Sequence, residues 1–117
     1  MNGFERDINV IKDIINYCYE IKEARELFGD SFEALADNKH YQNDVSMCIL
    51  QIGELSSRLT ENFKEQYDGV SWRDIKGMRN IAAHDYKHMI LKLLWEVISK
   101  DVIDLCEYCE KILELET

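Results

Sequence analysis

The chain has 117 residues, contains no proline and carries a formal net charge of −9, from 14 Lys and Arg against 23 Asp and Glu. This length supports one hydrophobic core, so we expect residues 1–117 to form a single domain, and the acidic balance excludes a protein that coats nucleic acids with its whole surface. No apolar run approaches the ~18 residues of a membrane span, and the amino terminus lacks the order of a signal peptide, so we expect a cytoplasmic protein.

The first predicted element is a helix over residues 4–28. Apolar side chains recur at helical spacing along one face, with acidic residues opposite. This face comprises Ile8, Ile11, Ile14, Ile15, Cys18 and Ile21. Gly29 follows at the position where a helix end favours glycine, and Asp30 or Ser31 can cap a short helical turn through Leu35.

A second long helix is predicted from a start between residues 40 and 43 to an end before Gly69. Its buried face comprises Val45, Cys48, Ile49, Ile52, Leu55, Leu59 and Phe63. Gly53 and Glu54 interrupt this face. A glycine within a helix costs about 1 kcal/mol relative to alanine, so we infer that Gly53 permits the close approach of another backbone.

Two further helical segments are predicted in the second half of the chain. Ser71 and Asp74 form an S-x-x-D start signal for a helix from Trp72 toward Ala83. The segment over residues 87–116 is apolar through Met89, Leu93, Leu94, Val97, Val102, Leu105, Cys109 and Ile112. It forms either one helix or two helices joined at a kink near residues 99–101. The chain is therefore predicted to be an all-α, up-and-down bundle of four to five helices.

The four cysteines are predicted to be reduced thiols that fill the core. Cys106 and Cys109 form a C-x2-C pair, but the chain has no second pair at zinc-finger spacing. Each cysteine continues an apolar stripe, as a small core residue does. We therefore expect no metal site and no cofactor.

A small basic segment stands out from the acidic chain. Residues 73–92 contain Arg73, Lys76, Arg79, Lys87 and Lys92 against Asp74 and Asp85, which is 5 − 2 = +3. Such a segment can bind a phosphate locally although the rest of the chain repels it. We expect Arg73, Lys76 and Lys87 to contact RNA or another phosphate.

The same segment contains candidate catalytic groups. Histidine transfers protons near neutral pH, and arginine binds phosphate and the charge that builds on it. These groups suit RNA cleavage by the 2′-hydroxyl: His84 moves a proton, Arg79 stabilises the phosphorane, and Asn80 adds hydrogen bonds. Arg79 and His84 are about 140° apart on a straight helix, so either the helix ends between them or a second copy of the chain completes the site.

Structural roles explain the same residues without catalysis. Arg79 could pair with Glu54 across helices, and His84 could cap the preceding helix. His84 and His88 are four residues apart, as in some metal sites, but the glutamate of the metalloprotease motif is missing between them. Tyr86 could be a half-buried residue with a hydrated hydroxyl.

The wider pattern resembles one family. Arg79-Asn80-x3-His84-x-Tyr86 is similar to the R-x4-H-x-Y motif of the HEPN superfamily, and specifically of HepT-like toxins. "QIGEL" from Gln51, "SWRDIKGMRN" from Ser71 and "LLW" from Leu93 resemble that family in the same order. Family members often have a proline before the tryptophan and another in the last helical segment, whereas this chain has neither.

The resemblance implies an all-α HEPN-like homodimer with metal-independent endoribonuclease activity, in which Arg79, Asn80 and His84 are the catalytic motif residues. It also implies a type VII toxin–antitoxin pair, whose minimal nucleotidyltransferase antitoxin transfers AMP from ATP to Tyr86. The added phosphates would occupy the RNA site and repel the substrate. The alternative is a catalytically silent subunit that binds a nucleotide or substrate and docks a nucleotidyltransferase.

Overall fold

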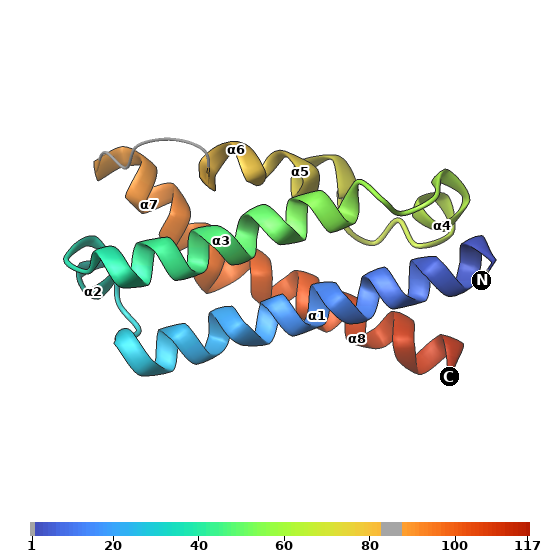
Figure 1. The fold of residues 1–117 in the computed structure, drawn as a ribbon, viewed down its shortest axis with the longest axis horizontal. Helices are drawn as coiled ribbons and strands as arrows, with labels where there is room; N and C mark the ends of the chain where they lie inside the picture. The colour runs from blue at the N-terminus through green and yellow to red at the C-terminus, as the bar shows by residue number, and fades with distance from the viewer. Residues whose placement is uncertain (1, 83–87) are drawn as a thin grey trace.

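The computed structural model describes residues 2–82 and 88–117, and all regular elements within these ranges are helices. They are α1 (Gly3–Phe28), α2 (Phe32–Ala36), α3 (Lys39–Ser56), α4 (Glu61–Gln66), α5 (Trp72–Gly77), α6 (Arg79–Ala82), α7 (His88–Glu96), the π-helix η1 (Val97–Asp101) and α8 (Val102–Glu116). Figure 1 shows the chain running up and down between the ends of one elongated bundle, with both termini at the same end. The all-α prediction is confirmed, whereas the single domain and the homodimer stay predictions.

The start of the bundle follows the expected signals. Gly29 ends α1 with a φ of 118°, a backbone conformation that favours glycine, and its N–H donates to the Arg25 carbonyl. The Ser31 hydroxyl accepts a hydrogen bond from the backbone N–H of Ala34 at 3.1 Å and so caps α2. The predictions for the first helix and the short turn are therefore confirmed.

The predicted second helix is wrong at its C-terminal end, because it divides into α3 and α4. The hydroxyls of Ser56 and Ser57 donate to the carbonyls of Gly53 and Glu54, at 2.8 and 2.6 Å, where α3 ends. Thr60 then caps α4 by accepting from the N–H of Phe63 at 3.2 Å. The buried Asp7 carboxylate accepts from the backbone N–H and the hydroxyl of Thr60, at 2.9 and 2.7 Å, and fixes this break against α1.

The last helical segment is interrupted although it contains no proline. Between α7 and α8 the chain widens into the π-helix η1, which frees backbone carbonyls from the α-helical pattern. The Ser99 hydroxyl donates to the Trp95 carbonyl at 2.5 Å, and the Arg25 guanidinium donates to the Ile98 carbonyl at 3.5 Å. Side chains therefore satisfy the irregular backbone. Of the two alternatives, one helix or two helices joined near residues 99–101, the structure shows two helices joined by η1.

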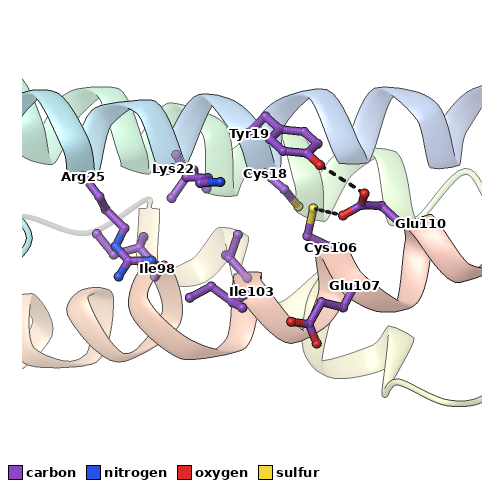
Figure 2. A pocket seen from close by; sticks show the side chains of 11 residues that line it. Cys18, Tyr19, Lys22, Arg25, Ile98, Ile103, Cys106, Glu107 and Glu110 are labelled. Carbon is purple, nitrogen blue, oxygen red and sulfur yellow. Dashed lines mark hydrogen bonds between the residues drawn. The ribbon is translucent and has the colours of Figure 1, made fainter.

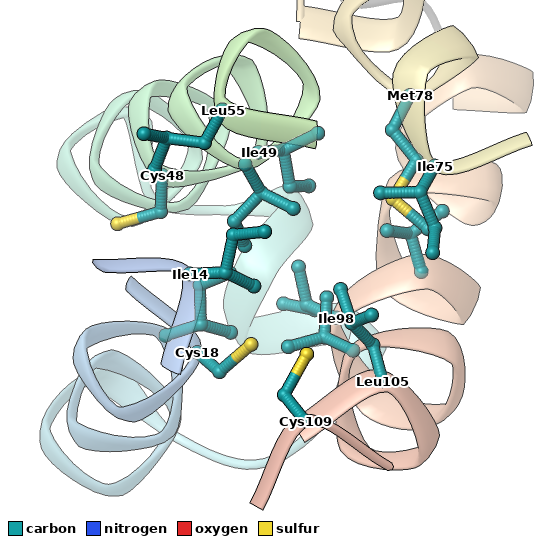
Figure 3. Close-up of a cluster of buried hydrophobic side chains, with 14 of the residues drawn as sticks. Ile14, Cys18, Cys48, Ile49, Leu55, Ile75, Met78, Ile98, Leu105 and Cys109 are labelled. Carbon is teal, nitrogen blue, oxygen red and sulfur yellow. The ribbon is translucent and has the colours of Figure 1, made fainter. Parts of the chain in front are cut away.

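The core lies where the apolar faces of the long helices meet. In Figure 3, Ile14 of α1, Ile49 of α3 and Leu105 of α8 point toward the same interior, and these three side chains are almost fully buried. The apolar residues of α7 differ in burial, because Leu93 is 45% exposed while Leu94 is fully buried. Among the described helices, none is both long and apolar enough to cross a membrane, and the cytoplasmic location stays a prediction.

Candidate functional site

The candidate site begins at a close contact between α3 and the α5–α6 segment. A Cβ placed on Gly53 would lie 3.1 Å from the Arg79 Cβ and 3.2 Å from the Lys76 carbonyl oxygen. A side chain at these distances would require α5 or α6 to shift, so the glycine allows the backbones to pack directly. The inference drawn from this mid-helix glycine is confirmed, and the neighbour that approaches it carries Arg79 itself.

Arg79 forms an ion pair with the residue after that glycine. Its Nη1 donates to the Glu54 Oε1 at 2.8 Å, with the two side chains 38% and 44% exposed. A guanidinium carries five N–H donors, so this single bond does not exhaust its capacity to bind a phosphate. The pair that the sequence offered as a structural alternative therefore exists, and it lies at the surface rather than in the core.

The other predicted site residues divide into two groups. Arg73, Lys76 and Asn80 are exposed on α5 and α6, where their side chains can reach a ligand from solvent. The predictions for His84, Tyr86 and Lys87 fall on residues 83–87, outside the described residues.

The Ser71 hydroxyl accepts from the N–H of Asp74 at 3.3 Å, so the start signal that orients α5 is confirmed. The expected third helix breaks at Met78, which gives α5 and α6 in place of one element.

A groove of about 420 Å³ lies between the α5–α6 segment and the α7–η1 segment. Arg73 and Asp74 of α5 line one wall, and Leu93 of α7 lines another, together with Val97 and Asp101 at the two ends of η1. Leu93 borders this groove, in keeping with the exposure of its side chain. The π-helix therefore shapes a concave surface beside the basic segment, and such irregular turns occur frequently at functional sites.

One group of potential metal ligands occurs in the part of the chain that the structure describes. Ligand atoms of Glu20, Asp44 and Cys48 lie within 4.8 Å of one another between α1 and α3. The Cys48 thiol donates to the Glu20 carboxylate at 3.3 Å. Burial and this acidic neighbour raise the pKa of Cys48, so the thiol keeps its proton at neutral pH. These contacts account for the group as a hydrogen-bonded cluster, and the expectation of no metal site stays a prediction.

The comparisons with known proteins decide the family. The family model described as ribonuclease HepT-like matches residues 14–112, which include Glu54 and the whole motif segment. The chain belongs to the HepT-like ribonuclease family. The resemblance that rested on the motif and its flanking sequences is therefore confirmed over most of the chain, and family membership supports an assignment to the endoribonucleases.

Individual relatives of this HepT-like chain agree with that assignment. It is 34% identical over 88 residues to a provisionally named RNase of Caldanaerobacter subterraneus, with 75% of this chain and 79% of the relative covered. It is 28% identical to the "Probable ribonuclease HepT" of Thermococcus cleftensis, with 83% and 93% covered. It is 32% identical to a Methanocaldococcus jannaschii protein named as a gamma-glutamylcyclotransferase and, provisionally, an RNase. There the match covers 88% of this chain but only 49% of the longer relative. No solved structure matches the chain significantly.

Proposed function

We propose that this HepT-like protein is a metal-independent endoribonuclease that works as a homodimer, with Arg79, Asn80 and His84 in the catalytic site. The single observation that carries the proposal is the family match over residues 14–112, which contain the complete R-x4-H-x-Y motif. The surface position of Arg79 supports it, because a half-exposed guanidinium can meet a phosphate in solution.

The proposed reaction is transesterification within RNA. The 2′-oxygen attacks the adjacent phosphorus while its proton leaves to a base, and the bond between phosphorus and the 5′-oxygen breaks as that oxygen gains a proton. His84 serves in this proton transfer, and Arg79 stabilises the negative charge that builds on the phosphorane oxygens. Glu54 of α3 acts as a positioning residue, because its Oε1 accepts a hydrogen bond from the Arg79 Nη1 at 2.8 Å.

We further propose that the protein is the cytoplasmic toxin of a type VII toxin–antitoxin pair. In this proposal a cognate minimal nucleotidyltransferase transfers AMP from ATP to the Tyr86 hydroxyl, with release of pyrophosphate. Tyr86 is two residues from His84 in the sequence, so the added phosphate would compete with RNA for Arg79 and the exposed Arg73 and Lys76. The net charge of −9 restricts such competition to this basic segment.

A second candidate function is a catalytically silent subunit that binds a nucleotide or substrate and docks the nucleotidyltransferase. The ion pair between Arg79 and Glu54 favours it, because an arginine already bound to a carboxylate competes less well for RNA. Cleavage of RNA by the purified protein separates the two candidates.

The decisive experiment measures RNA cleavage by the purified protein in the presence of a metal chelator. We expect cleavage by the natural sequence and a loss of about 10²-fold or more in Arg79→Ala and in His84→Ala, because each change removes a transition-state interaction. Size-exclusion chromatography with light scattering should show dimers for all three proteins. Equal cleavage by His84→Ala would remove that histidine from the mechanism, and no cleavage by any of them would favour the silent subunit.

The modification has its own test. Incubation with the cognate nucleotidyltransferase and ATP should add the mass of one or more AMP units to the intact protein and abolish its RNA cleavage. Tyr86→Phe should gain no mass, because the accepting hydroxyl is gone. Tyr67→Phe is a control that removes a different tyrosine hydroxyl. Uptake of the same mass by Tyr86→Phe would place the modification on another residue.

A further inference from the structure

Two cysteine side chains from opposite ends of the sequence meet between α1 and α8. Cys18 of α1 is 3% exposed, and Cys106 of α8 is half-buried. Figure 2 shows their sulfur atoms pointing toward each other across the interface of the two helices. A hydrogen bond with Cys106 is the largest cause of a raised pKa for the Cys18 thiol, and burial adds to it. The two thiols are therefore direct neighbours.

The half-buried member of this pair is accessible to small molecules. Cys106 lines a groove of about 260 Å³ between α1 and the η1–α8 segment, together with the cationic side chains of Lys22 and Arg25. The Cys106 thiol donates to the Glu110 Oε1 at 3.4 Å, and the Tyr19 hydroxyl donates to the Glu110 Oε2 at 3.0 Å. The Glu110 carboxylate therefore joins Cys106 of α8 to Tyr19 of α1 at the wall of the groove, where a small disulfide can reach the Cys106 sulfur.

We propose that Cys18 and Cys106 form a reversible disulfide that joins α1 to α8, by exchange with a small disulfide such as oxidised glutathione. The Cys106 thiolate attacks one glutathione sulfur, the glutathione S–S bond breaks, and one glutathione thiolate leaves. Cys18 then loses its proton as its sulfur attacks the Cys106 sulfur and expels the second glutathione. Two protein thiols are oxidised, and one glutathione disulfide is reduced to two thiols.

Rival pairings are disfavoured by the positions of the other two cysteines. Cys109 is fully buried and does not line the groove, whereas Cys18 and Cys106 both line it. Cys48 lies on α3, where its thiol is hydrogen-bonded to Glu20. The C-x2-C spacing of Cys106 and Cys109 is therefore a weaker guide to pairing than the contact between α1 and α8.

The test treats the full-length protein with oxidised glutathione, alkylates the remaining thiols and measures masses. We expect the intact protein to lose two hydrogen atoms, and trypsin to release residues 13–22 linked to residues 101–111. Cys109→Ala should keep this link, whereas Cys106→Ser and Cys18→Ala should lose it. The urea midpoint of the natural sequence should rise on oxidation and return with dithiothreitol, because the link restricts most of the unfolded chain.

Several outcomes would overturn the proposal. One is a disulfide within peptide 101–111, and another is a disulfide that requires Cys109 or Cys48. A third is a stable glutathione adduct on Cys106 that does not go on to form a disulfide with Cys18. Cys106→Ser keeps the test valid if Cys18→Ala fails to fold, since Cys106 is only half-buried and its replacement leaves the core in place. RNA cleavage is not used as a readout, so failure here is independent of the proposed nuclease.

Discussion

The contact of α1 with α3 and the contact of α3 with α6 hold the same molecule together by different means. Between α1 and α3, branched apolar side chains such as Ile14 and Ile49 are completely buried. Between α3 and α6, a glycine removes the side chain and an ion pair half-exposed to water closes the gap. The first contact gains free energy from buried apolar area. The second gains little, because exposed ion pairs contribute about 0–1 kcal/mol.

This difference indicates that the two contacts have different roles in the protein. The packed faces of α1, α3 and α8 determine whether the chain folds, whereas the glycine and the glutamate on α3 determine where Arg79 lies. Changes in the first region should therefore alter stability without altering the activity of each folded molecule. Changes in the second should alter activity more than stability.

The largest effect expected from a single change tests the first half of this comparison. Ile49→Ala should lower the free energy of unfolding by about 2–5 kcal/mol, because it leaves a cavity at a fully buried position. Leu93→Ala is the matched control, since Leu93 is 45% exposed on α7 and should cost under about 1 kcal/mol. Urea denaturation followed by circular dichroism measures both. Equal losses in the two variants would show that the groove beside α7 is as important to folding as the core.

Much of this architecture can be predicted from the sequence, since it depends on local signals. The apolar stripe of α1 and the capping residues Gly29, Ser31 and Ser71 each act within a few residues of their own position. The contact of Gly53 with α6 could also be anticipated, because a mid-helix glycine has an energetic cost that a close neighbour explains. The pairing of Arg79 with Glu54 was one of two open interpretations of the arginine; the ion pair exists, and the catalytic role stays a prediction.

What the sequence patterns do not reveal lies mainly in contacts between distant residues. The hydrogen bond from Thr60 to Asp7, which is 53 positions away in the sequence, fixes the break between α3 and α4 against α1. Hydrophobic periodicity continued through Leu59 and Phe63, so it gave no sign of that break. The exposure of Leu93 depends on the groove beside η1, which local apolarity does not reveal. No local pattern reports that Cys18 faces Cys106, because their helices meet only in the folded chain.

A smaller effect tests the positioning role of Glu54. Glu54→Ala should reduce RNA cleavage by about tenfold, because the Arg79 guanidinium loses the carboxylate that orients it, while the free energy of unfolding changes by under about 1 kcal/mol. Glu54→Gln retains an acceptor oxygen and should recover part of the activity. Glu61→Ala breaks an exposed pair with Lys64 on α4 and serves as the control. Higher cleavage in Glu54→Ala would mean that the ion pair restrains the nuclease.

The smallest expected effect comes from replacing two glycines, one with space for a Cβ and one without it. Gly77→Ala should stabilise the protein by up to about 1 kcal/mol, because alanine favours the helix and its Cβ would meet nothing within 4 Å. Gly53→Ala has the same intrinsic gain, but its Cβ would press on the Arg79 Cβ and on the Lys76 carbonyl, which is backbone and moves only with α5. We expect a net loss of about 1 kcal/mol and weaker RNA cleavage, as α6 shifts with Arg79. Stabilisation by both substitutions would show that α3 and α6 have room between them, and the placement of Arg79 would then depend on Glu54 alone.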